Sequence, residues 1–116
     1  MLGRATAMGA LSDRAIVLIR LAAGEYGRFP ELAKALFDLA PARSYDRFAD
    51  FLRAKQANGE VDVEDVQIAS EQFLAGLVGH LQLRKLLTDD DPSPAEIERR
   101  IELAIEKFLR GYGVPG

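Results

Sequence analysis

The sequence predicts an all-α domain of about five helices, of which the last two form an intersubunit four-helix bundle. Two observations lead to this prediction. Apolar residues recur at three- and four-residue intervals in five segments, each bounded by capping or stop residues. No stretch alternates convincingly between apolar and polar residues, as a half-buried strand would. At 116 residues, the chain has the length of one domain with one core.

Composition excludes several classes of protein. Hydrophobic residues make up 48% of the chain, which excludes disorder. The net charge is −3, whereas isolated nucleic-acid-binding domains are usually basic, so we expect no direct nucleic acid contact by this chain. No apolar run approaches the roughly 18 residues that a membrane span needs, so no membrane partner is expected. The absence of cysteine excludes disulfides and fits a cytoplasmic protein.

The first two helices are predicted over residues 12–26 and 30–39. Ser12 is a suitable N-cap for the first helix, and Gly27 is its stop. Its centre, AIVLIRLAA, is apolar nearly all round, which indicates a buried central helix. Pro30 occupies the first position of the second helix, where its missing N–H costs nothing. Residues 1–11 precede these signals and are expected to be a linker or a disordered start.

The third and fourth helices follow directly. The third begins near Pro41 and ends at Asn58-Gly59, a signal for a left-handed C-cap. The fourth starts after Asp62, its expected N-cap, and runs to about residue 87. This helix is apolar over most of its circumference, so we expect it to be buried on more than one side. A domain of this size covers one side, and the simplest candidate for the other is a second copy of the chain.

The last helix is predicted from Pro94 to Tyr112, with Ser93 as the N-cap. Glu96 completes a capping box by reaching back to the backbone N–H of Ser93. One side of the helix carries a broad apolar stripe, which needs a large partner surface. Two such consecutive helices from each of two subunits make an isologous four-helix bundle, so a homodimer is expected.

Four residues of the fourth helix bear on this interface. Gly76 and Gly79 each cost roughly 1 kcal/mol relative to Ala, which either the close approach of a partner helix offsets or the helix simply tolerates. His80 is either packed in an interface or binds a ligand, and Arg84 either pairs with an acidic residue across the interface or is solvated. The dimer-interface candidates are Gly76, Gly79, His80, Arg84, Ile97, Ile101, Ile105 and Phe108.

Catalytic and metal-binding chemistry finds little support. One histidine and no cysteine provide too few ligands for a transition-metal site. The run Asp89-Asp90-Asp91 lacks the spaced ligands of a calcium loop and is expected to be an acidic, solvated connection. The serines lack a nucleophile motif. We therefore expect no catalytic residue, no metal, no cofactor and no enzymatic activity.

Three stretches carry a family resemblance when taken together and in order. They are GRFPELAKALFDLAPARSYDRFADFLRAKQANGEV, then IASEQFLAGLVGHLQLRKLL, then SPAEIERRIELAIEKFLRGYG. From about residue 22 to 113, the chain resembles the C-terminal regulatory domain of the tetracycline-repressor (TetR) family of transcriptional regulators. The resemblance implies that the last two helices form the dimer interface and that an effector pocket lies among the helices before them. Family members begin with a three-helix DNA-binding head, for which this chain has no room. We therefore expect residues 12–113 to be the effector-binding and dimerisation domain, with the N-terminal helix-turn-helix domain absent.

A small apolar or aromatic effector is the ligand that such a pocket would take. Tyr45 and Arg20 are of most interest because a buried polar group needs a partner. For every candidate the alternative is plain core packing. The pocket candidates are Arg20, Phe37, Tyr45, Phe48, Leu52, Phe73 and Leu77. The expected function is effector sensing and dimerisation for a TetR-like regulator. The alternative is a headless helical dimer that pairs with a full-length relative.

Overall fold

The computed structural model describes residues 6, 8–88 and 90–114. Its five named helices are α2 (Asp13–Gly24), α3 (Pro30–Leu39), α4 (Pro41–Ala57), α5 (Val66–Thr88) and α6 (Pro94–Tyr112). The prediction of an all-α fold with five helices is confirmed. Among the described residues the strand-like pairing is one isolated antiparallel bridge, between Val61 and Gly113. Within the predicted linker, Thr6 and residues 8–10 are helical, Leu11 is buried, and the remaining residues lie outside the described part.

Four helices begin where local capping chemistry places them, whereas α2 ends at Gly24, before the predicted stop at Gly27. The Ser12 hydroxyl accepts a hydrogen bond from the N–H of Ala15, and Ser93 accepts one from the N–H of Glu96. Pro30 and Pro41 occupy the first turns of α3 and α4. These positions match the sequence prediction.

Two capping predictions need correction. The N-terminus of α5 is capped by Asp65, whose carboxylate accepts a hydrogen bond from the N–H of Ile68 at 3.0 Å, and Asp62 instead donates its N–H to the carbonyl of Tyr112. Glu96 binds Arg84 rather than the N–H of Ser93, so the capping box is half formed. For Glu96, a contact with helix α5 replaces the local one.

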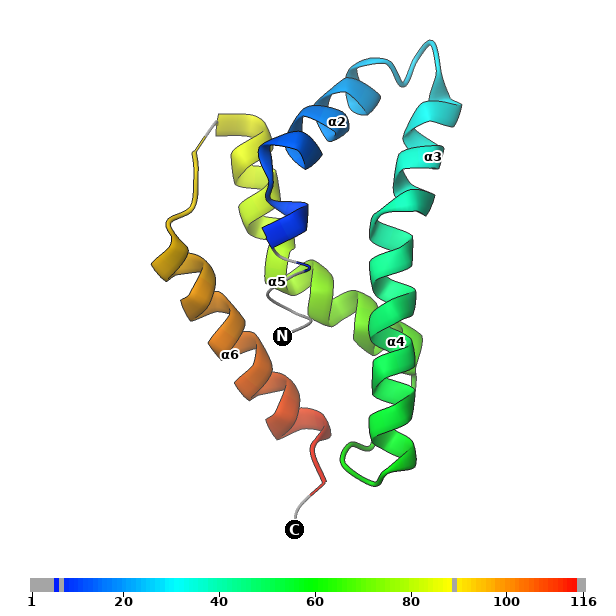
Figure 1. The fold of residues 1–116 in the computed structure, drawn as a ribbon, viewed down its shortest axis with the longest axis vertical. Helices are drawn as coiled ribbons and strands as arrows, with labels where there is room; N and C mark the ends of the chain where they lie inside the picture. Colours follow the sequence, from blue (N-terminus) through cyan, green and yellow to red (C-terminus); the bar gives the residue numbers. More distant parts are fainter. Residues whose placement is uncertain (1–5, 7, 89, 115–116) are drawn as a thin grey trace.

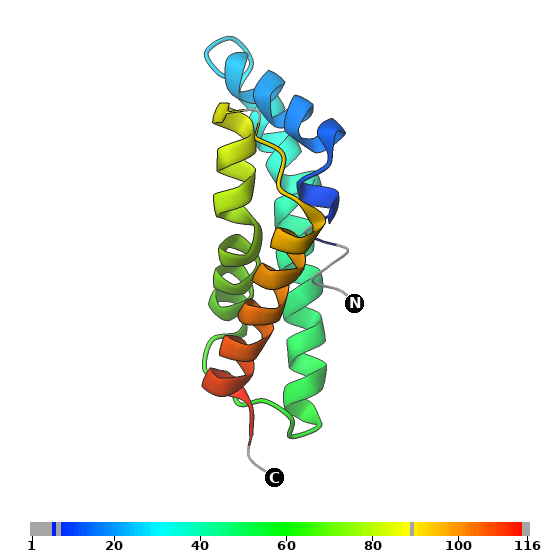
Figure 2. The same ribbon diagram turned by 90° about the vertical axis from the view of Figure 1, so that its left-hand side faces the viewer.

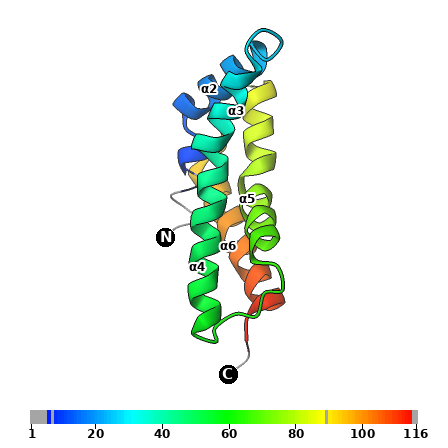
Figure 3. The ribbon, with the colours of Figure 1, turned by 90° about the vertical axis from the view of Figure 1, so that its right-hand side faces the viewer.

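The helices form a long, thin arrangement. In Figure 1, α3 and α4 follow one another along one side, α6 lies on the other, α5 runs between them, and α2 crosses one end. Figures 2 and 3 show the same slab from its two edges. The Cα extents are 52 × 32 × 17 Å, and the radius of gyration is 15.5 Å, against about 13 Å for a compact chain near this length. The shape leaves much of each helix at the surface.

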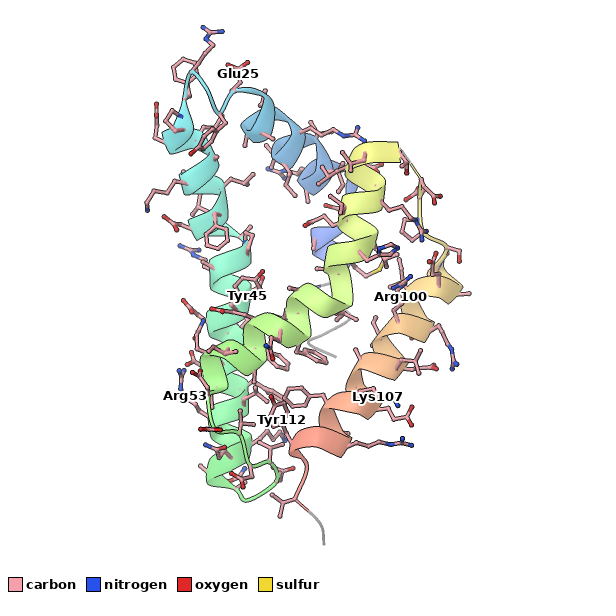
Figure 4. All side chains as sticks on the ribbon, turned by 180° about the vertical axis from the view of Figure 1, so that it is seen from behind. Glu25, Tyr45, Arg53, Arg100, Lys107 and Tyr112 are labelled. Atoms are coloured by element: carbon pink, nitrogen blue, oxygen red, sulfur yellow. The ribbon has the colours of Figure 1, made fainter. Side chains whose placement is uncertain are left out.

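Two apolar clusters hold the slab together. The first joins α5 to α6 and to the segment before α2, and it consists of Leu11, Leu77, Leu81, Ile97 and Ile101. The second joins α4, the α4–α5 connection and α5, and it consists of Phe48, Leu52, Val61, Val63, Ala69 and Leu74. Around the second cluster the rings of Phe48 and Phe73 stack at 4.8 Å, and the ring of Phe108 meets that of Phe73 edge-on at 5.2 Å. Figure 4 shows Tyr112 extending this aromatic contact from the end of α6 toward α4. The apolar stripe of α6 is therefore covered largely within the chain.

The prediction of a buried central first helix is wrong. In α2 the buried side chains are those of Ile16 and Ala22, whereas Val17 and Leu21 each remain more than half exposed. The helix lies across the end of the slab, so neighbours cover only one of its sides. The apolar side of α2 that carries Val17 and Leu21 is therefore a surface that this chain does not cover.

Candidate effector cavity and dimer face

A half-enclosed cavity of about 1040 Å³ lies among α2, α3, α4 and α5. Its volume is at the upper end of the range for small-molecule sites, which runs to about 1,000 Å³. Most of the wall is aliphatic or aromatic. The described lining residues are Thr6, Gly9, Ala10, Ala15, Leu18, Ile19, Ala22, Ala23, Tyr26, Ala33, Leu36, Phe37, Ala40, Pro41, Ser44, Tyr45, Arg47, Leu74, Val78 and Gln82.

Small side chains at helical spacing explain why this space is not filled. On α2, Ala15 and Ala22 lie two turns apart on the side that faces the cavity, and α3 presents Ala33 in the same way. Alanine contributes an apolar wall without occupying the volume that Leu or Phe would fill. These alanines are not among the residues predicted from the sequence to line a pocket, although their helical spacing was the available signal.

Six polar side chains interrupt the apolar wall. Four carry hydroxyl groups, one carries a guanidinium and one a carboxamide: Thr6, Tyr26, Ser44, Tyr45, Arg47 and Gln82. No carboxylate is among the described lining residues. The cavity is therefore suited to an uncharged or anionic ligand with an extended apolar body.

Two of the predicted pocket residues line this cavity. Phe37 and Tyr45 stand in its wall and also border a second hollow of about 320 Å³, which contains the carboxylates of Asp46 and Glu71. Figure 4 shows Tyr45 on α4 near the crossing with α5. Arg20 is placed elsewhere, because its guanidinium donates to the carbonyls of Lys85 at 2.8 Å and Leu86 at 3.3 Å, near the end of α5.

The other four candidates belong to the core clusters. Phe48, Leu52 and Phe73 pack in the second cluster and Leu77 in the first. On α5 the cavity wall consists instead of Leu74, Val78 and Gln82, which follow one another at four-residue intervals. Successive residues of an α-helix are rotated by about 100° around its axis. The cavity therefore lies against a side of α5 that is turned by about 100° from the side that carries Phe73 and Leu77.

A cluster of ion pairs ties the end of α5 to its neighbours. Arg84 binds the Glu96 carboxylate through two N···O contacts of 2.9 Å and Asp90 through a third of 2.9 Å. The hydrogen bond to Glu96 raises the pKa of Arg84, and the same bond lowers the pKa of Glu96. Arg84 thus pairs within its own chain. Asp89, the first residue of the predicted acidic connection, lies outside the described residues.

Lys85 makes a parallel set of contacts. Its ammonium donates to the Leu11 carbonyl at 2.8 Å and pairs with Asp13 at 3.0 Å and Asp91 at 3.1 Å. The hydrogen bond to Asp13 is the main cause of the raised pKa of Lys85. These contacts fasten the start of α2 to the end of α5.

The dimer-interface candidates divide into two groups. Ile97 and Ile101 are buried in the first core cluster, Ile105 packs against it, and Phe108 packs against the second. One protomer already provides the contacts of these side chains. They therefore offer a partner little free surface.

The remaining candidates lie on an open side of α5. No neighbouring atom lies within 4 Å of the position that a Cβ on Gly76 or Gly79 would occupy. On the same side of the helix, Leu83 and Leu87 remain 56% and 75% exposed. We refer to Gly76, Gly79, His80, Leu83 and Leu87 as the exposed α5 face.

Neither a metal site nor a membrane span is found among the described residues. The described part of the chain contains no group of three or more His, Cys, Asp or Glu residues placed to hold a metal ion. Across these same residues, no helix has the combined length and apolar character that spanning a membrane requires.

Solved structures of transcriptional regulators share this fold. A structure described as a TetR-family transcriptional regulator from Mesorhizobium loti superposes with a TM-score of 0.89 at 23% identity, covering 97% of this chain and 56% of that one. The flavonoid-responsive regulator FrrA superposes with a TM-score of 0.80 at 30% identity, covering 94% of this chain and 56% of that one. The chain thus spans little more than half the length of these regulators. No curated protein sequence matches it. The sequence model of the AefR-like transcriptional repressor C-terminal domain matches residues 1–114. The chain therefore belongs to the AefR-like C-terminal domains of the TetR-family transcriptional regulators.

Proposed function

We propose that this chain is the effector-sensing and dimerisation domain of a TetR-type transcriptional regulator. The observation that carries the proposal is the cavity of about 1040 Å³ among α2, α3, α4 and α5. A globular domain close-packs its interior, so an apolar space of this size is most simply explained by a ligand. The domain has no catalytic role in this proposal, and DNA is bound by a head domain outside this chain.

The proposed effector is a small apolar or aromatic molecule. The largely apolar wall favours such a ligand, and the hydroxyl groups of Tyr26, Ser44 and Tyr45 suit one with a few oxygen substituents. FrrA, which is 30% identical, is described as responsive to flavonoids, and flavonoids are aromatic molecules of this kind. A regulator of this type acts where the chromosome is, so we place it in the cytoplasm.

The proposed homodimer rests on uncovered surface. The accessible surface is 7602 Å², whereas a compact monomer of 12.7 kDa exposes about 6,200 Å². A standard interface removes about 800 Å² per partner, which the excess can supply. The exposed α5 face offers two leucines beside two glycines, so that another helix can approach closely. In a two-fold dimer the same face meets itself.

The proposed mechanism is a shift between two dimer states. The effector favours one relative placement of the two attached heads, and the operator favours another, so each ligand weakens the binding of the other by the same factor. The domain contributes the cavity and the interface to this coupling.

A cavity-filling substitution tests the proposal. We expect Ala33→Phe to weaken the binding of the flavanone naringenin at least tenfold in isothermal titration calorimetry, because the new ring occupies the cavity wall. Ala35→Phe is the matched control, since Ala35 is exposed on the same helix and does not line the cavity. Equal binding by both variants, with the wild-type affinity retained, would contradict the proposed site.

A further inference from the structure

Among the cavity-lining side chains that the structure describes, that of Gln82 alone has its orientation fixed by a hydrogen bond to another segment. Its Nε2 donates to the backbone carbonyl of Ala10 at 3.1 Å. Only the NH₂ end of a carboxamide can donate to a carbonyl, so this contact determines which way the group is turned. The carboxamide oxygen Oε1 is then the end that is left over.

No donor on a described residue reaches this oxygen. Within the part of the chain that the structure describes, Oε1 of Gln82 accepts no hydrogen bond, and the side chain is half-buried in a mainly apolar wall. An acceptor in such a place gains from a donor that a ligand supplies. Water can serve it while the cavity is empty, but a bound apolar body excludes water.

The other polar groups of the wall do not impose the same requirement. The hydroxyls of Thr6, Tyr26, Ser44 and Tyr45 can donate or accept by rotation, and the guanidinium of Arg47 only donates. Among the described side chains of the wall, Gln82 alone therefore presents an acceptor of fixed character. A ligand whose oxygen carries no hydrogen satisfies the other groups but leaves Gln82 unsatisfied.

We infer that Gln82 is a specificity-determining residue that selects effectors carrying a hydroxyl donor, namely phenols and related aromatic alcohols, over their methyl ethers. The inference rests on the proposed effector cavity and names the chemical class that it takes. A phenol is favoured over its methyl ether because the ether lacks the donor and leaves the Gln82 acceptor desolvated and unpaired. The methyl group itself changes only the apolar contact.

Matched probes test the inference. The fluorescent molecules 2-naphthol and 2-methoxynaphthalene differ in that a methyl group replaces the hydroxyl hydrogen, which removes the donor. The chain contains no tryptophan to interfere with naphthalene emission. We expect the wild-type chain to bind 2-naphthol about 2- to 12-fold more tightly, which is the range of a net hydrogen bond. In Gln82→Leu and Gln82→Met the ratio is expected to fall to about one, with circular dichroism confirming that both variants fold.

A control separates specificity from a structural role. Lys85→Met removes the hydrogen bond to the Leu11 carbonyl, next to that of Ala10, from a residue outside the cavity wall. This variant is expected to keep the wild-type ratio. The inference is overturned if the ratio is near one in the wild type, survives in both Gln82 variants, or falls equally in Lys85→Met. Failure of both probes to bind the wild type would instead remove the proposed cavity function, and the inference with it.

Discussion

The exposed α5 face yields the sharpest quantitative expectation. Leu83 and Leu87 lie one turn apart and retain 56% and 75% of their surface in the protomer. Full burial of a leucine contributes about 1.5–3 kcal/mol. Added together, the exposed parts of Leu83 and Leu87 amount to a little more than one whole leucine per protomer. A two-fold dimer buries this amount twice, once from each protomer. Their burial in an interface therefore contributes about 4–8 kcal/mol to dimerisation.

Replacing both residues removes this contribution. For Leu83→Glu/Leu87→Glu we expect the dimer dissociation constant to rise by at least about 1,000-fold, because about 4 kcal/mol is lost at about 1.4 kcal/mol per tenfold. Sedimentation velocity over a wide range of concentrations measures the constant. Both positions are exposed in the protomer, so the circular dichroism spectrum should not change. Leu39→Glu is the matched control, since Leu39 is 62% exposed but lies on α3.

Two results would refute this reasoning. One is a double variant that dimerises as tightly as the wild type, and the other is a wild-type chain that is monomeric at micromolar concentration. Ile101→Glu does not serve the same purpose. Ile101 is 2% exposed in the first core cluster, so a carboxylate there should unfold the protomer instead of separating two folded ones.

Two further expectations concern stability. The hydrogen bond to Arg84 is the main reason why the pKa of Glu96 is lowered in the folded state. The pair therefore stabilises the fold at every pH above 4.5, the ordinary pKa of a glutamate. This contribution is lost as the pH falls through the lower pKa that Glu96 has in the folded state. Urea denaturation should therefore show Glu96→Gln less stable than the wild type at pH 7 and nearly equal to it in strong acid; a constant difference at every pH would refute this. A Cβ on Gly113 would lie 2.5 Å from the carbonyl oxygen of Leu109, so Gly113→Ala should lower the thermal midpoint. Gly111→Ala meets no atom within 4 Å inside α6 and should raise stability by about 0.5–1 kcal/mol; the opposite order of the two variants would contradict this geometry.

Helix boundaries were predictable because their signals are local. A hydroxyl at an N-cap, as in Ser12 and Ser93, acts within three residues of itself, and so does a proline in the first turn. At Gly59 the φ of 77° needs no partner outside its own turn. The prediction failed where a distant segment competed. The N–H of Asp62 donates to the carbonyl of Tyr112, so Asp62 belongs to a connection held against the end of α6, and the helix begins later with Asp65 as its cap.

The cavity was less predictable because its position depends on how α5 is rotated. The family resemblance implied that the fourth predicted helix forms a pocket wall and made Phe73 a candidate, but the ring of Phe73 stacks on Phe48 in the core. A resemblance of this kind does not specify which side of a helix faces which neighbour. Gln82 was predictable only as part of a polar stripe, since its partner is a carbonyl 72 residues away.

Three sides of α5 make three different contacts, with the core, with the cavity and with the proposed partner. This arrangement can couple effector binding to dimer geometry. Leu81 packs toward α6, Gln82 borders the cavity, and Leu83 is exposed on the face proposed for the partner. These three residues are consecutive, so a rotation or shift of the helix that suits a ligand at Gln82 must also move Leu83. The core contacts of Leu81 oppose a gradual movement of α5, because close-packed interiors favour a small number of discrete arrangements. A ligand in the cavity and a partner at the exposed α5 face would then bias the position of the same helix, which is the condition for linkage between two sites.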